Sequence, residues 1–174
     1  MLIESLIYYF NGNEIAESKY NLNLNKGILL IGKPGVGKSA IFQILKMYLK
    51  HITNNIRKSN LFRIESIESI KDEYKKSGNF NKYNLCGLYN RGLNLLINEF
   101  GVNYNEKIYG SNFQELFNSF LMRRYEIFVS YNKMTHATSN FDTVELSEIY
   151  DKVIIDRFKE MFNIIVLDGN SFRN

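Results

Sequence analysis

The sequence predicts an α/β fold in which helices cover both faces of a parallel β-sheet. Three observations support this fold class. Short, continuous apolar runs recur along the chain, as expected for strands that are buried on both faces. These runs alternate with stretches whose apolar residues repeat about every 3.6 positions, the pattern of amphipathic helices. A glycine-rich turn at residues 32–37 separates the first apolar run from the helix that follows it.

The predicted strands and helices follow one another without an internal repeat or a linker. The expected strands are residues 28–31, 61–64, 93–97, 134–138 and 164–167. The expected helices are residues 2–10, 38–50, 67–76, 113–128 and 144–162. The last helix is expected to break near Tyr150, and residues 11–26 have the composition of a polar connection. Strands that alternate with helices in this way indicate a parallel sheet.

Local signals mark several helix ends. Gly12 and Gly78 are expected to end the first and third helices, because glycine adopts the left-handed conformation common after a helix. Ser111 and Gln114 form a capping-box pattern before the helix at 113–128, in which each side chain satisfies a free backbone N–H group. We therefore expect Ser111 to cap that helix.

The composition is that of an ordinary globular domain, with 45% apolar and 23% charged residues. Residues 1–174 are expected to form a single domain, with residues 1–26 as an N-terminal helix and connection packed on the core. The net charge of +4 permits contact with nucleic acid but does not argue for it, because the charges are spread along the chain as on a solvated surface. The single cysteine, Cys86, excludes an internal disulfide and favours the cytoplasm. No apolar run approaches the roughly 20 residues that span a bilayer, so no membrane partner is expected.

Residues 32–39 fit the phosphate-binding pattern G-x-x-x-x-G-K-[ST]. In this pattern, glycines let backbone N–H groups turn inward around phosphates without a Cβ clash. Lys38 places a positive charge on the β and γ phosphates, Ser39 offers its hydroxyl to Mg²⁺, and the helix adds its positive end. The alternative is a mere turn. The residues expected to bind the nucleotide are Gly32, Lys33, Pro34, Gly35, Val36, Gly37, Lys38, Ser39 and Ala40.

A second motif, Leu-Leu-Ile-Asn-Glu at residues 95–99, has the pattern of a buried strand that ends beside the phosphate loop. The chain has no N-K-x-D stretch of the kind that reads guanine, so the two motifs together favour an ATPase over a GTPase. In that hypothesis, Glu99 polarises the attacking water. The alternative for Glu99 is a solvated carboxylate at the end of a strand.

With these motifs in place, the chain resembles the DnaC-like and IstB-like helicase-loader ATPases of the AAA+ class. The stretches that carry the resemblance are residues 32–39, 95–101, 123–126, 135–140, 156–163 and 169–173. The resemblance implies an AAA+-type P-loop NTPase domain with a five-stranded parallel sheet and helices on both faces. It also implies ATP and Mg²⁺ as cofactors, and assembly with copies of the chain or with a related AAA+ subunit.

The resemblance assigns roles to several residues by position. Asn140 is similar to the sensor residue whose amide hydrogen-bonds the γ-phosphate or the attacking water; alternatively it is a turn residue. Arg157 is similar to the arginine finger that reaches into a neighbouring subunit's site; alternatively it is a surface arginine. Arg173 resembles a terminal arginine that senses nucleotide. For His136, beside the sensor strand, we expect a packing role rather than catalysis.

The resemblance further implies contact with single-stranded DNA and with a replicative helicase. Aromatic faces stack on bases and lysines follow phosphates, so both residue types suit the task. The matching residues are Tyr74, Lys75, Lys76, Tyr104 and Tyr109. The alternative is a polar loop and a solvated helix face.

The sequence departs from the family pattern at the acidic pair, which normally begins with Asp. Asn98 stands there, so Ser39 and Asn98 are the expected metal ligands, and Asn98 carries no charge. Because Mg²⁺ favours charged oxygen ligands, we expect ATP binding to persist and hydrolysis to be slow. Only residues 1–26 precede the first strand, where full loaders place a helicase-grasping domain, so recruitment of a helicase is the weakest implication. Lys152 also stands where the family often has Arg.

Two hypotheses follow. The first is a helicase-loader-like ATPase that uses ATP to grip single-stranded DNA in replication or transposition. The second is a catalytically slow or silent partner protein in which ATP organises a protein interface. A small-molecule kinase is disfavoured, because the stretches at 135–140 and 156–158 resemble AAA+ parts.

Overall fold

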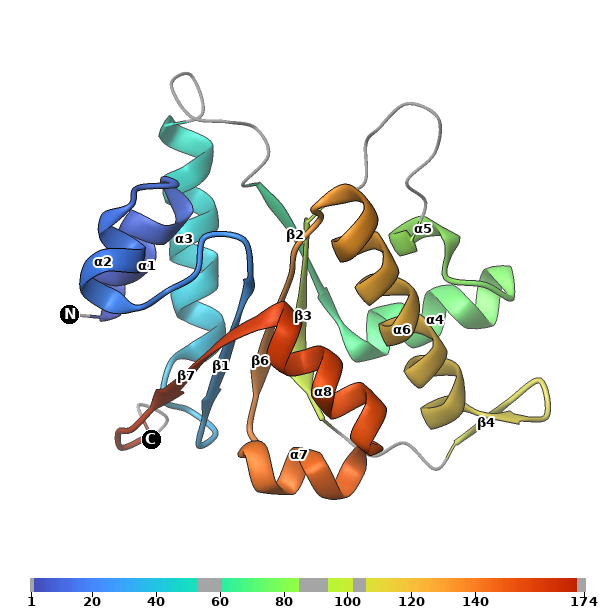
Figure 1. Ribbon diagram of the computed structural model, residues 1–174. Helices are drawn as coiled ribbons and strands as arrows, with labels where there is room; N and C mark the ends of the chain where they lie inside the picture. The colour runs from blue at the N-terminus through green and yellow to red at the C-terminus, as the bar shows by residue number, and fades with distance from the viewer. Residues whose placement is uncertain (1, 53–60, 85–93, 102–105, 172–174) are drawn as a thin grey trace.

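Five parallel strands form the central sheet, in the order β2-β3-β6-β1-β7 (Figure 1). Their bounds are β1 Gly27–Gly32, β2 Phe62–Ser66, β3 Asn94–Phe100, β6 Thr135–Ser139 and β7 Phe162–Leu167. The structure is a computed structural model that describes residues 2–52, 61–84, 94–101 and 106–171. Because all five strands are parallel, the carboxyl ends of β1, β3 and β6 meet at one edge of the sheet.

Helices cover both faces of this sheet (Figure 1). On one face lie α1 Leu2–Phe10, α2 Ile15–Tyr20 and α3 Lys38–Ile52. On the other lie α4 Ile67–Ser77, α5 Asn81–Asn84, α6 Phe113–Tyr131, α7 Thr143–Ile149 and α8 Lys152–Met161. A small antiparallel hairpin, β4 Lys107–Ile108 and β5 Ser111–Asn112, precedes α6.

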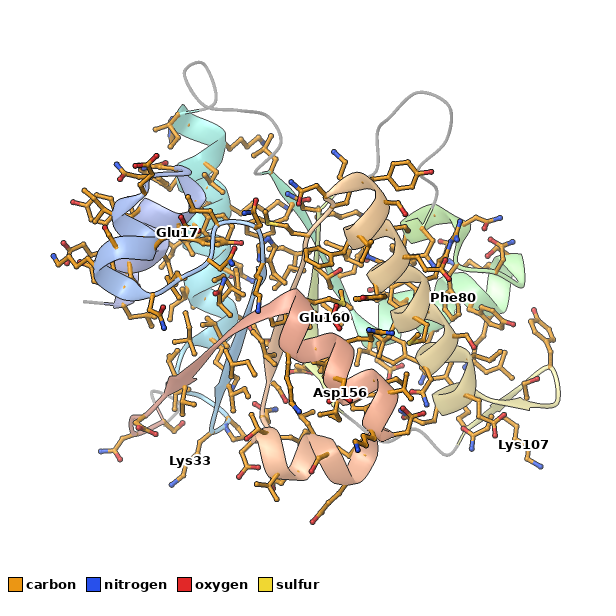
Figure 2. The ribbon with its side chains drawn as sticks, in the orientation of Figure 1. Glu17, Lys33, Phe80, Lys107, Asp156 and Glu160 are labelled. Carbon is orange, nitrogen blue, oxygen red and sulfur yellow. The ribbon has the colours of Figure 1, made fainter. Side chains whose placement is uncertain are left out.

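Alternate residues of the strands supply two separate hydrophobic cores, which side chains fill on either side of the sheet (Figure 2). Ile28 and Leu30 of β1 face α1 and α3, whereas Leu29 and Ile31 face α6 and α8. All four are nearly inaccessible to solvent. The continuous apolar run in the sequence therefore arises because β1 is buried on both faces.

The N-terminal helix belongs to one of these cores. Leu6 and Phe10 of α1 are buried with Phe42 of α3, and the Tyr9 hydroxyl donates a hydrogen bond to the carbonyl oxygen of Lys26. These contacts seat α1 beside the start of α3. Within the described ranges, no helix combines the length and apolar character needed to cross a bilayer.

All five predicted strands and all five predicted helices are confirmed, with shifts of a few residues at their ends. The last helix is broken at Tyr150, as expected, into α7 and α8. Gly78 ends α4 in the left-handed conformation. The polar connection at 11–26 was an incomplete prediction, because it contains α2; the β4–β5 hairpin was not predicted at all.

The predicted cap of α6 was wrong by one residue. Asn112, not Ser111, is the cap: its Oδ1 accepts a hydrogen bond of 2.8 Å from the backbone N–H of Gln114. Ser111 instead pairs with Ile108 in the hairpin. The Gln114 side chain donates to Asn118 at 3.1 Å and takes no part in a capping box.

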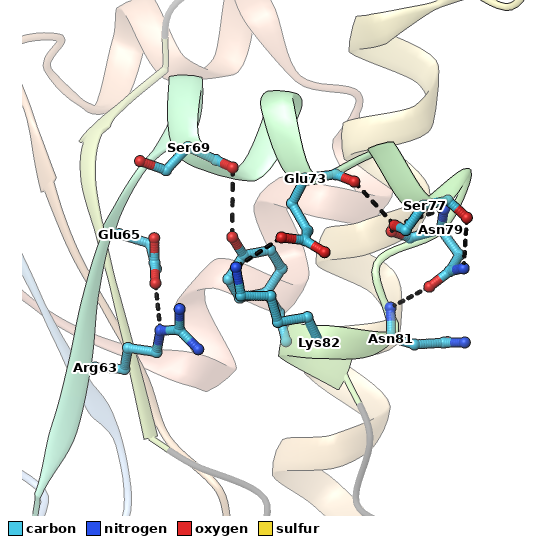
Figure 3. Close-up of polar contacts among 9 residues, drawn as sticks. Arg63, Glu65, Ser69, Glu73, Ser77, Asn79, Asn81 and Lys82 are labelled. Carbon is cyan, nitrogen blue, oxygen red and sulfur yellow. Dashed lines mark hydrogen bonds and ion pairs between the residues drawn. The ribbon is translucent and has the colours of Figure 1, made fainter. Parts of the chain in front are cut away.

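Polar contacts join α4 to α5 near the outer strand β2, which carries an ion pair of its own (Figure 3). Lys82 of α5 pairs with Glu73 of α4 at 2.6 Å, and Arg63 pairs with Glu65 along β2. The hydrogen bond from Lys82 lowers the pKa of the Glu73 carboxyl. Charged side chains on an edge strand also disfavour pairing with a strand of another chain.

His136 of β6 is buried inside the core that α1 and α3 cover. Its Nδ1 accepts a hydrogen bond of 3.1 Å from the backbone N–H of Ile28, and its ring lies 5.2 Å from Phe10 and 5.3 Å from Phe62, centroid to centroid. Burial, with a smaller contribution from Arg124, lowers its pKa from 6.5 to about 3. The imidazole is therefore neutral in the folded protein at neutral pH.

This neutrality predicts a pH-dependent stability. Below pH 6.5 the unfolded chain protonates His136 and the folded chain does not, so the free energy of unfolding should fall as the pH drops from 6.5 toward 3. The contribution of this residue has a limiting slope of about 1.4 kcal/mol per pH unit. Urea denaturation between pH 7.5 and 5 should give a smaller slope for His136→Gln than for the wild type. His51→Gln, on the exposed side of α3, is the matched control; equal slopes for the wild type and His136→Gln would refute the prediction.

Candidate nucleotide-binding site

The loop between β1 and α3 curves tightly because of its glycines. Gly35 and Gly37 have φ angles of 85° and 93°, in the region that residues with a Cβ rarely adopt. Gly35 is also closely packed: a Cβ built on it would lie 2.2 Å from the Ser171 Oγ. The loop leads directly into α3, whose first residue is Lys38. Backbone N–H groups at the start of this helix have no partner within it, and they form a site for anions.

Lys38 ties this loop to the neighbouring strand β6. Its side chain is buried, and its Nζ donates hydrogen bonds of 2.5 Å and 2.8 Å to the carbonyl oxygens of Gly32 and Lys33. A third bond of 2.7 Å goes to the Oδ1 of Asn140, the residue that follows β6. The proposed phosphate lysine and the proposed sensor are therefore in direct contact.

A cleft of about 610 Å³ opens in front of the loop. Its lining residues are Ile3, Pro34, Gly35, Val36, Gly37, Lys38, Ser39, Ala40, Ile41, Ile44, Glu99, Thr138 and Asn140. One end is apolar, with Ile3 of α1 and Ile44 of α3 about half exposed. Lys33 does not line the cleft, and its side chain extends into solvent (Figure 2).

Glu99 reaches the cleft because β3 carries a bulge. The pairing of β3 with β6 shifts between Ile97 and Phe100, so that one extra residue is accommodated in β3. Glu99 sits in this bulge with φ 62°, an unusual conformation for a residue with a side chain. Its backbone N–H donates a bond of 3.0 Å to the Thr138 Oγ1, and its side chain is exposed. The bulge thus turns a carboxylate outward at the end of a buried strand.

Asn98 joins three elements beside the cleft, through two residues that line it. Its Oδ1 accepts hydrogen bonds of 2.7 Å from both the Ser39 hydroxyl of α3 and the Thr138 hydroxyl of β6. Sequence reasoning missed Thr138. The available signal was its spacing: it precedes Asn140 by two positions, and residues two apart on a strand face the same side.

The residues expected to hold Mg²⁺ do not fit a tightly bound ion. Ser39 and Asn98 are brought together, but both are neutral, and the Asn98 oxygen already accepts two hydroxyl protons. Mg²⁺ is ordinarily held by carboxylates as well as by phosphates. Among the described residues, no three His, Cys, Asp or Glu side chains cluster so as to bind a metal.

Arg157 lies away from this cleft, on the side of α8 that faces α6. Its Nη1 pairs with Glu160 at 2.8 Å, and its guanidinium lies 4.4 Å from the ring centroid of Tyr125 in α6. The Tyr125 hydroxyl donates to Glu160 at 2.7 Å, which lowers the pKa of that carboxyl (Glu160 is labelled in Figure 2). Arg157 is not among the residues that line the cleft of its own chain.

The residues expected to contact DNA partly converge on the far side of the sheet from α1 and α3 (Figure 1). The Tyr109 hydroxyl, at the tip of the β4–β5 hairpin, donates to the carbonyl oxygen of Lys75 in α4. The rings of Tyr74 and Tyr109 are 6.5 Å apart. Lys76 is exposed on the same helix. Tyr104, like Arg173, lies outside the described residues.

Several solved structures with this fold are replication proteins. The DnaC helicase loader is similar over 96% of this chain and 88% of its own, with 17% identity and a TM-score of 0.60. DnaI is similar over 98% and 84%, with 21% identity and a TM-score of 0.63. The replication initiator DnaA bound to AMPPCP and single-stranded DNA is similar over 95% and 46%, with 18% identity and a TM-score of 0.59. No protein-family model and no curated protein sequence matches the chain.

The sheet order, the phosphate loop and these similarities define an AAA+-type P-loop NTPase fold, which confirms the fold class that the sequence predicts. Within that class, the chain has the fold of the DnaC-like helicase loaders. The three neighbours described above are helicase loaders and a replication initiator.

The contacts of Thr138 predict that its hydroxyl stabilises the bulge. In Thr138→Val the Glu99 N–H loses its acceptor and Asn98 loses a donor, so the free energy of unfolding should fall by about 1–3 kcal/mol. Thr138→Ser keeps the hydroxyl and should lose less. Urea denaturation measures both variants. Equal stability of the Val and Ser variants would show that the hydroxyl contributes nothing.

Proposed function

We propose that this chain binds ATP through residues 32–40 and acts as a helicase-loader-like protein in DNA replication or transposition. The observation that carries the proposal is the cleft itself, where the phosphate loop, Lys38, Glu99 and Asn140 line one space. Two supports are independent of the motif: the fold, and the bound AMPPCP in the solved structure of DnaA.

Each group in the cleft has a use in binding a triphosphate. The N–H groups of the loop and of the first turn of α3 offer hydrogen bonds to phosphate oxygens. Lys38 holds its charge on oxygen acceptors at 2.5–2.8 Å, and a phosphate oxygen can replace Asn140 as the third acceptor. The apolar end, formed by Ile3, Ile41 and Ile44, suits the face of a base.

Two residues suit the hydrolytic step. Glu99, exposed in the cleft, can accept a proton from an attacking water, and the Asn140 amide can orient that water or the γ-phosphate. Arg157 would act on the site of a second copy or of a related AAA+ subunit. In this chain Tyr125 and Glu160 hold the guanidinium between α8 and α6, so the proposed role requires Arg157 to leave these contacts when a second subunit binds.

Single-stranded DNA is the proposed nucleic-acid partner, and a replicative helicase is a further proposed partner. Tyr109 is 73% exposed at the hairpin tip, where its ring offers a face for stacking. Lys75, whose carbonyl oxygen accepts the Tyr109 hydroxyl, and the exposed Lys76 lie on α4 and offer positive charge to the phosphates of a bound strand. The solved structure of DnaA contains single-stranded DNA, which agrees with this class of partner.

The second candidate function is a slow or silent partner protein in which bound ATP organises an interface. Asn98 favours it, because an uncharged amide replaces a carboxylate beside the hydroxyl of Ser39. In this case bound ATP stabilises the interface, and the protein does not need to hydrolyse it.

Nucleotide binding should depend on Lys38 and not on its neighbour Lys33. Both are cations of the same loop, but only Lys38 lines the cleft. We expect Lys38→Ala to weaken ATP binding about a hundredfold or more, because a charge-assisted contact with the phosphates is lost. Lys33→Ala should stay within a few fold of the wild type. Isothermal titration calorimetry with ATP decides, and equal losses in the two variants would contradict the proposal.

Turnover should separate the two candidate functions. A helicase-loader-like ATPase should release phosphate faster when single-stranded DNA is present. Its rate of phosphate release should also rise more than linearly with protein concentration, since the proposed arginine finger acts between subunits. Arg157→Ala should then cost about a hundredfold or more. Arg123→Ala is the matched control, because Arg123 also pairs with a Glu three residues later on a helix surface. Tight ATP binding without turnover under any of these conditions would favour the silent partner.

A further inference from the structure

The floor of the cleft lacks the negative charge that a bound magnesium ion would need from the protein. Ser39 and Thr138 line the cleft and each donates a hydrogen bond of 2.7 Å to Asn98 behind them, and all three are neutral. The charged side chains that line the cleft are Lys38 and Glu99. Glu99 belongs to the bulge, and its side chain is exposed and takes no part in the hydrogen bond between Ser39 and Asn98.

The hydrogen-bond chemistry of Asn98 strengthens this point. Its Oδ1 accepts two hydroxyl protons, and Thr138 in turn accepts the N–H of Glu99, which fixes the order of donors and acceptors. The remaining polar group of Asn98 is its NH₂, which can only donate. A water bound to Mg²⁺ must itself donate to the protein, so the amide nitrogen cannot hold it, whereas the second oxygen of an aspartate would.

The same amide changes how the cleft receives a nucleotide without metal. ATP that carries no Mg²⁺ has a greater negative charge, and a carboxylate at position 98 would repel it. With Asn98 in place, the phosphates that approach Lys38 and the N–H groups of the loop meet no carboxylate at position 98. Asn98 thus lowers the affinity for the magnesium complex of ATP and raises the affinity for metal-free ATP. Both effects reduce the difference between the two affinities.

We propose that this site binds nucleoside triphosphate with an affinity that is nearly independent of Mg²⁺. This inference rests on the proposed nucleotide-binding function and specifies the form of the ligand: the phosphates are held by Lys38 and by backbone N–H groups, and the metal contributes little. It assigns Asn98 a role in setting this metal independence, because its side chain carries no negative charge and its free polar group is a hydrogen-bond donor.

Calorimetry with ATP tests the proposal, once in excess MgCl₂ and once in EDTA. For the wild type, the dissociation constants in MgCl₂ and in EDTA should agree within about threefold. For Asn98→Asp, the constant in EDTA should exceed the constant in MgCl₂ by about tenfold or more, because the new carboxylate attracts the magnesium complex and repels metal-free ATP. Asn25→Asp, an exposed site before β1, makes the same chemical change at the opposite end of the sheet and should behave as the wild type does.

The possible outcomes are distinct. A wild-type ratio of tenfold or more overturns the metal independence, whether or not Asn98→Asp folds. A wild-type ratio near one with the same ratio in folded Asn98→Asp overturns the role of Asn98. An absence of ATP binding by folded wild-type protein in either buffer overturns the proposed function itself. Circular dichroism of each variant confirms that it is folded before titration.

Discussion

The buried ammonium of Lys38 is the contact on which the arrangement of the cleft depends. A cation away from water must be surrounded by oxygen acceptors, and here they come from two different strands. The carbonyl oxygens belong to Gly32, the last residue of β1, and to Lys33, the next residue, whereas Asn140 directly follows β6. Because β1 and β6 are neighbours in a parallel sheet, these acceptors lie at the same edge. The lysine therefore fixes the phosphate loop against the strand that carries the proposed sensor.

A second, uncharged junction lies beside it. Asn98 accepts the hydroxyl protons of Ser39 and Thr138, and so connects β3, the start of α3 and β6. An aspartate would satisfy the same two donors, which explains how the shape of the site is kept when the charge is removed. What changes is the electrostatic environment: position 98 contributes no negative charge beside the hydroxyl of Ser39. The fold and the local geometry thus depend on hydrogen bonds that either an amide or a carboxylate can accept. The preference for a metal depends instead on the charge at position 98.

The elements that the sequence predicted are those whose signals are local. The apolar run of β1 and the helical period of α3 need no knowledge of the rest of the chain, and the glycines between them imply the turn directly. The features that escaped depend on tertiary contacts. The bulge at Glu99 exists only in register with β6, and the cap of α6 moved from Ser111 to Asn112 because Ser111 is held by Ile108 across the hairpin. Thr138 is an ordinary strand residue until the fold places Asn98 beside it.

The proposed DNA surface differs from a simple basic patch. Glu106 pairs with Lys75 at 2.6 Å and with Lys71 at 3.0 Å, and these lysines lower the pKa of its carboxyl. Phosphates that approach α4 must therefore compete with an existing carboxylate for Lys75, which reduces the electrostatic gain. The ring of Tyr109 meets no such competition, since most of it is exposed at the hairpin tip. If single-stranded DNA binds here, base stacking must supply more of the affinity than neutralisation of phosphate, so the affinity would depend less on salt than the lysines alone imply.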